Sequence, residues 1–213
     1  MIGMRTRAAG LMLLLAGSAG CAPPDTAELA YLPPSGEPVA HRSAFVQQQP
    51  WLVWGNILDR LQQQGVQVSG LDEATRTLTV AYSGDPEPYV DCGWIVTYED
   101  DELDRLPAAR ADTSFPRRRD GEVVTLERDL KLDARMNVRV DPSGENAVVR
   151  TDSTYALTKT IAGPETEQPL HAETIRFPRG RSGTFSSGTE CQATGELERL
   201  VFEALPAVSL AGS

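Results

Sequence analysis

The three cysteines, Cys21, Cys92 and Cys191, are the residues of this sequence with the most distinctive chemistry. A cysteine thiolate can form a thioether, join a second cysteine in a disulfide, or bind a metal ion. Metal binding has little support, because no CxxC motif occurs and neither of the two histidines, His41 and His171, lies near a cysteine in the sequence. Structural zinc sites need four such ligands at recognisable spacings. We therefore expect no metal ion and no cofactor.

The first 20 residues have the features of a secretory leader. Arg5 and Arg7 form a short cationic start, and an almost unbroken apolar run covers residues 8–16. That run is too short to cross a bilayer, which takes about 20 apolar residues, so an uncleaved anchor helix is disfavoured. A cationic start followed by a short apolar core is typical of a cleaved signal peptide. We assign residues 1–20 to it.

Small residues stand directly before Cys21, in the order Ser18-Ala19-Gly20-Cys21. This segment resembles the bacterial lipobox, with Ser18 where that family usually has Leu. The resemblance implies cleavage before Cys21 and acylation of that cysteine, and several acyl chains anchor a protein stably. Ala22, in place of Asp, implies outer-membrane sorting with the body on the periplasmic face, if the source is Gram-negative and its sorting is enterobacteria-like. The alternative is an ordinary secretory signal followed by an incidental cysteine.

The charge of the chain limits its partners. The sequence has 20 basic and 30 acidic residues, and because Arg5 and Arg7 leave with the leader, the mature chain keeps 18 basic residues and a net charge of −12. A body with this net charge is not expected to bind nucleic acid or anionic lipid headgroups, because both are negatively charged. We expect its partners to be the bilayer, through acylated Cys21, and an envelope protein.

Lipidation of Cys21 leaves Cys92 and Cys191 as an even pair in an oxidising compartment. We predict a disulfide between them. It would close a loop of about 100 residues, to which the chain-entropy model assigns up to about 4.7 kcal/mol.

Catalytic motifs are missing from the sequence. It contains no G-x-S-x-G, no P-loop and no dinucleotide fingerprint. The Ser/Gly-rich segment 182–188 follows no strand-to-helix elbow, and the acidic run 99–104 lacks the alternating ligands and mid-loop glycine of a calcium loop. We expect that the chain is not an enzyme, and an enzymatic role is the third of our hypotheses.

The elements that follow Cys21 begin with a tether. Residues 21–49 are rich in proline and lack apolar periodicity. They form either a passive spacer or a segment that orders on a partner, with Tyr31 and Leu32 as its apolar contacts. Apolar residues at helical spacing then predict a helix over 50–64, with Pro50 in its first turn and Gly65 as a left-handed C-terminal cap.

A strict two-residue alternation predicts a long antiparallel hairpin, with one strand over 130–140 and the other over 149–157. A last helix is predicted over 195–205, and residues 207–213 are predicted to be a disordered tail. The expected fold of the single domain, residues 50–206, is α+β: an antiparallel sheet with the N- and C-terminal helices on one face, similar to a helix grip.

The leader, the Pro-rich tether and the helix–sheet–helix order together resemble the C-subunit lipoproteins of the outer-membrane β-barrel assembly machinery, which have helix-grip domains. The resemblance implies a structural or interaction module in envelope assembly or maintenance. The alternative is a carrier of lipid or another small apolar ligand, whose cavity would be lined by Trp54, Met136 and Tyr155.

Overall fold

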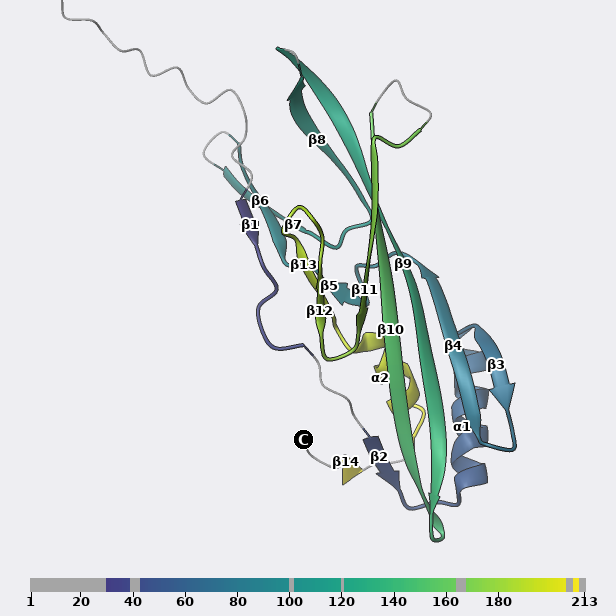
Figure 1. Ribbon diagram of the computed structural model, residues 1–213. Helices are drawn as coiled ribbons and strands as arrows, with labels where there is room; N and C mark the ends of the chain where they lie inside the picture. Colours follow the sequence, from purple (N-terminus) through teal and green to yellow (C-terminus); the bar gives the residue numbers. More distant parts are fainter. Residues whose placement is uncertain are drawn as a thin grey trace, which may run out of the picture.

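A long antiparallel hairpin forms the centre of the molecule (Figure 1). The computed structural model describes residues 30–38, 43–99, 102–119, 121–163, 168–205 and 209–210. Strands β9 (Glu122–Ser143) and β10 (Asn146–Ala162) are joined by a two-residue turn, Gly144-Glu145, in which Gly144 has φ +64°. A positive φ at this point suits glycine. The predicted hairpin is confirmed, and both strands extend well beyond the predicted limits.

Shorter strands extend the hairpin on both sides to give an eight-stranded antiparallel sheet. The edge of β9 that faces away from β10 pairs with two strands, β4 (Thr77–Gly84) and β8 (Asp112–Arg119), which lie one after the other along it. The edge of β10 that faces away from β9 pairs in the same way with β2 (Ser43–Val46) and β11 (His171–Pro178). Outside them lie β3 (Val68–Asp72), paired with β4, and β14 (Ser209–Leu210), paired with β2.

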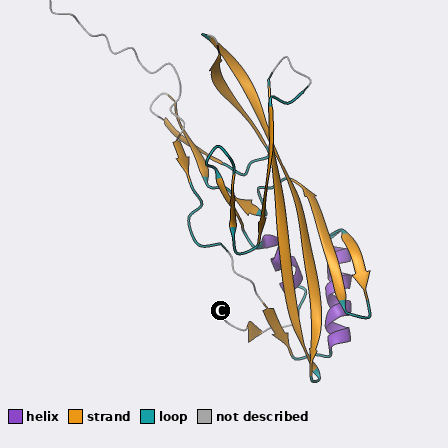
Figure 2. Cartoon of the chain, viewed as in Figure 1, coloured by secondary structure: helices purple, strands orange, loops and turns teal. Residues whose placement is uncertain are grey.

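Two three-stranded sheets lie beside the main sheet (Figure 2). The first has the order β1 (Ala30–Leu32), β6 (Trp94–Glu99), β7 (Glu102–Pro107). The second has the order β12 (Ser182–Thr184), β13 (Glu190–Ala193), β5 (Val90–Asp91).

The two helices are short. Helix α1 (Pro50–Gln63) begins with Pro50 and is followed by Gly65 with φ +69°, as the sequence predicts. Helix α2 (Glu196–Phe202) is shorter than predicted. Both contribute to one core with the inward side chains of β9 and β10. Neither is long and apolar enough to cross a bilayer, and the same holds for every helix in the described part of the chain.

The predicted fold class is wrong. The described chain is mainly antiparallel β-structure in three sheets, not an α+β domain with two helices packed on one face of a sheet. The largest error lies between residues 99 and 121, whose polar sequence predicts irregular structure but where β7 and β8 form. Strand β8 contains Pro116 and a run of arginines, which hide its strand character. Proline is tolerated there because β8 is an edge strand, paired only with β9.

The predicted tether and tail also contain strands. Residues 30–32 pair with β6, and residues 43–46 pair with β10, so parts of the segment 21–49 belong to the folded body. Ala44 and Val46 are buried in the core. Ser209 and Leu210, expected in a disordered tail, pair with β2.

Candidate functional site

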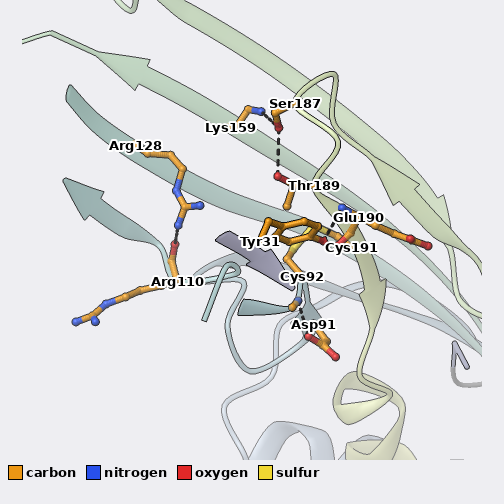
Figure 3. Close-up of a disulfide and its surroundings, with 11 residues drawn as sticks. Tyr31, Asp91, Cys92, Arg110, Arg128, Lys159, Ser187, Thr189, Glu190 and Cys191 are labelled. Atoms are coloured by element: carbon orange, nitrogen blue, oxygen red, sulfur yellow. Dashed lines mark hydrogen bonds between the residues drawn. A yellow bond between two sulfur atoms is a disulfide. The ribbon is translucent and has the colours of Figure 1, made fainter. Parts of the chain in front are cut away.

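The disulfide between Cys92 and Cys191 is present, which confirms the predicted pairing (Figure 3). Cys92 follows β5 and Cys191 lies in β13, and both side chains are buried. The bond joins positions 99 residues apart. It fixes the second small sheet to the chain that leads into β6.

Tyr31 ties the N-terminal strand β1 to the same region (Figure 3). Its hydroxyl accepts a hydrogen bond from the backbone N–H of Glu190 at 2.9 Å and donates one to the backbone carbonyl of the same residue at 3.0 Å. Partial burial is the largest cause of a raised pKa of Tyr31, which keeps the phenol protonated and able to donate. Glu190 precedes Cys191, so the first strand and the disulfide form one structural unit, which we call the N-terminal clamp.

A buried ionic cluster connects α2 to the main sheet. The Glu198 carboxylate accepts a hydrogen bond from the Tyr155 hydroxyl at 3.0 Å and lies 3.7 Å from Nε of Arg179. Arg179 also donates to the Thr151 hydroxyl at 3.0 Å. Burial, followed by the charge of Glu198, raises the pKa of Tyr155, so this phenol stays protonated. All four side chains are nearly inaccessible to solvent, which leaves no room for a substrate and indicates a structural role.

Lys159 and Ser187 form the contact that most resembles a catalytic pair. Lys159 Nζ donates to Ser187 Oγ at 3.0 Å, but it also lies 3.5 Å from the Glu173 carboxylate. The backbone N–H and the hydroxyl of Ser186 are the main causes that lower the pKa of Glu173 to about 2. Lys159 Nζ is therefore shared between the Glu173 carboxylate and the Ser187 hydroxyl, as in a structural ion pair. The cluster holds the loop between β12 and β13 against β10 and β11.

A hollow of about 690 Å³ lies on the outer face of the main sheet, opposite the core. Two transverse rows of paired residues cross four strands in it. The rows are Ser83–Asp133–Ala156–Arg176 and Ala81–Arg135–Thr154–Pro178. The lining includes short side chains, Ala81 and Ala156 among them, and three charged ones, Asp133, Arg135 and Arg176. Neighbouring strands lie about 4.8 Å apart, so Asp133 and Arg176, two strands apart, are separated by about 10 Å at the backbone.

The charges around the hollow differ from those farther along the same face. Asp141 pairs with Arg139 at 2.6 Å and also pairs with Arg150. By contrast, Asp133, Arg135 and Arg176 make no side-chain hydrogen bond or ion pair with any residue in the described ranges. They therefore remain able to pair with a ligand or partner.

The other residues singled out from the sequence are dispersed. Cys21 lies outside the described residues. Trp54 packs against the core, and Met136 and Tyr155 are buried within it. Of the three, only Tyr155 also borders the hollow, so together they do not enclose an apolar cavity. Among the described residues, no group of three or more His, Cys, Asp or Glu side chains converges as a metal site requires.

The hollow could not be found from local sequence. The alternation in β9 places Asp133 and Arg135 on an exposed face, but Ser83 and Arg176 join them only through the register of four strands. Comparison with known proteins gives no further guide to function: no protein-family model matches the chain, and no curated protein matches its sequence.

Proposed function

We propose that the chain is a lipoprotein of the cell envelope, acylated on Cys21, whose periplasmic body binds an extended segment of a partner protein on the outer face of the main sheet. The leader and the residues before Cys21 support the anchor, and Ala22 supports its placement in the outer membrane of a source with enterobacteria-like sorting. The proposed role is that of an interaction module in envelope assembly or maintenance, and it includes no catalytic step.

The observation that carries the binding role is the hollow with its three unpaired charges. Arg135 and Arg176 offer guanidinium groups suited to carboxylates, and Asp133 offers an acceptor for an amine or guanidinium. The expected partner segment therefore presents carboxylates to the two arginines and a cationic group to the aspartate. A lipid or small apolar ligand is the weaker candidate, because the lining combines these charges with Ser83 and Thr154.

A crosslinking experiment in the native host tests this role. A photoreactive amino acid in place of Ala156, which lines the hollow, should capture one discrete protein, whereas the same group in place of Glu203, on the end of α2, should not. The captured protein is then identified, purified and titrated against the body. Equal capture at both positions would refute a partner site in the hollow.

Charge reversal then measures the contribution of the two arginines. The double variant Arg135→Glu/Arg176→Glu is expected to weaken binding of the identified partner by at least about tenfold, or about 1.4 kcal/mol. Lys131→Glu changes an exposed charge of the same strand outside the hollow and is expected to have a much smaller effect. Equal losses from the two variants would point to general attraction between charges and would contradict the site.

A further inference from the structure

We infer that Leu32 and Trp94 form a membrane-seating patch, which rests on a surface of zwitterionic lipid and fixes the orientation of the anchored body. The inference rests on the proposed anchoring at Cys21 and adds a second contact with the bilayer, made by the folded body.

Leu32 and Trp94 are opposite one another in the pairing of β1 with β6, so their side chains point to the same face of the small sheet. They are 42% and 44% exposed, respectively. Pro107 of β7 lies beside Trp94 on this face, and Arg105 follows two residues away. The patch therefore combines an aromatic ring, an aliphatic side chain and one exposed cation. Tryptophan with a neighbouring arginine is typical of the membrane interface, where the ring lies among headgroups and the cation reaches phosphate.

The chain length between the anchor and the patch limits how far the patch can be from the membrane. Ala30 lies nine residues after Cys21. A fully extended chain spans at most about 3.3–3.6 Å per residue, so the start of β1 cannot lie more than about 30 Å from the acylated cysteine. The exposed apolar pair is therefore held close to the bilayer by any conformation of the connecting residues.

The patch is also fixed to the body, as an orienting contact requires. β1 is held by Tyr31, which is bonded to Glu190 within the N-terminal clamp. Gly93, between Cys92 and Trp94, lies so close to β1 that a Cβ atom there would be 2.0 Å from the Leu32 carbonyl oxygen. Its φ of +75° suits glycine alone among common residues. The residue before β6 is therefore packed directly against the backbone at the end of β1.

The net charge selects the lipid class. A mature chain of net charge −12 is repelled by anionic headgroups, so the patch suits zwitterionic lipid. Among the described residues, Trp51 is a second exposed tryptophan, with 63% of its surface accessible, and it belongs to α1, which lies far from β1 (Figure 1). It provides a matched control, because it has the same fluorophore on the same body without the proximity to Cys21.

The test uses single-tryptophan chains that begin at Cys21. Because Cys92 and Cys191 form a disulfide, Cys21 is the one free thiol of the sequence and can be coupled to a maleimide lipid in phosphatidylcholine vesicles. Trp51→Phe/Trp54→Phe leaves Trp94, and Trp54→Phe/Trp94→Phe leaves Trp51. Trp54→Phe suits both chains, since the buried Nε1 of Trp54 has no hydrogen-bond partner among the described residues.

Lipids brominated on their acyl chains should quench Trp94 by roughly half or more and leave Trp51 nearly unchanged, because only Trp94 lies at the interface. Adding Leu32→Glu to the Trp94 chain should remove most of this quenching. Equal quenching of both tryptophans, or an unquenched Trp94 that instead crosslinks to a second copy or another protein, would overturn the membrane-seating patch. Chemical coupling makes the result independent of lipidation in the cell, so failure of the patch and failure of the proposed anchor are distinguishable.

Discussion

The double variant Cys92→Ala/Cys191→Ala is expected to unfold with a free energy about 2–5 kcal/mol lower than that of the wild type. Two effects contribute. Without the bond, the unfolded chain regains the freedom of a loop spanning 99 positions, which the chain-entropy model values at up to about 4.7 kcal/mol. In the folded state, β13 loses its covalent link to the chain between β5 and β6.

Urea unfolding with and without reductant measures this effect. Reductant should lower the midpoint of the wild type toward that of the double variant and leave the double variant unchanged, since its remaining Cys21 forms no internal disulfide. Tryptophan fluorescence is a suitable signal because Trp94 lies two residues after Cys92. A wild-type midpoint that does not respond to complete reduction would contradict the stabilising role of the bond.

Glu198→Ala is expected to produce the second large effect, a loss of about 3–5 kcal/mol. The substitution removes the carboxylate beside the guanidinium of Arg179, whose side chain is 1% exposed, and takes away the acceptor of the Tyr155 hydroxyl. Breaking a buried ion pair is costly because the remaining charge stays out of water. Calorimetry or urea unfolding of the purified variant gives the free-energy difference directly.

The same region of the chain offers a matched control. Glu203 follows α2 and pairs with Arg199 at the surface, and exposed pairs of this kind contribute at most about 1 kcal/mol. Glu203→Ala should therefore cost little. Replacing both partners, in Arg179→Met/Glu198→Leu, should recover much of the loss because apolar side chains of similar size then fill the site of the buried ion pair. A Glu198→Ala variant as stable as Glu203→Ala would show that the cluster does not hold α2 on the sheet.

The disulfide and the Glu198 cluster both lie on the core side of the main sheet, away from the hollow. The disulfide and Tyr31 hold the small sheets, and the Glu198 cluster holds α2, so the core side of the main sheet is covered by elements that are fixed in place. The opposite face is then free to present the hollow across four paired strands.

Some features follow directly from local sequence. The strict alternation around Met136 predicts the hairpin, and Pro50 with Gly65 marks the limits of α1. The disulfide prediction follows from the two cysteines that are left once Cys21 is assigned to the proposed anchor. The hairpin and the helix are predicted from residues that are close in sequence, and the disulfide is predicted from the number of cysteines.

Other features depend on contacts between distant segments. Strand β8, with Pro116 and its arginines, is a strand because β9 offers it a free edge. Tyr31 and Leu32, which the sequence places in a tether, are ordered by β6 and by Glu190. The hollow requires Arg176 to lie two strands from Asp133, which is set by the register of β11 on β10. The periodicity of one segment does not show which distant strand that segment pairs with, and this explains the error in fold class.

The modification of Cys21 is the central claim, because the proposed location in the envelope depends on it. The proposed contact of Leu32 and Trp94 with lipid depends on it as well. Intact mass spectrometry of the native protein, followed by sequencing of its N-terminal peptide, tests it most directly. We predict a chain that lacks residues 1–20 and begins at Cys21 with the added mass of its acyl chains. A chain that keeps the leader, or one with an unmodified thiol at Cys21, would contradict the account.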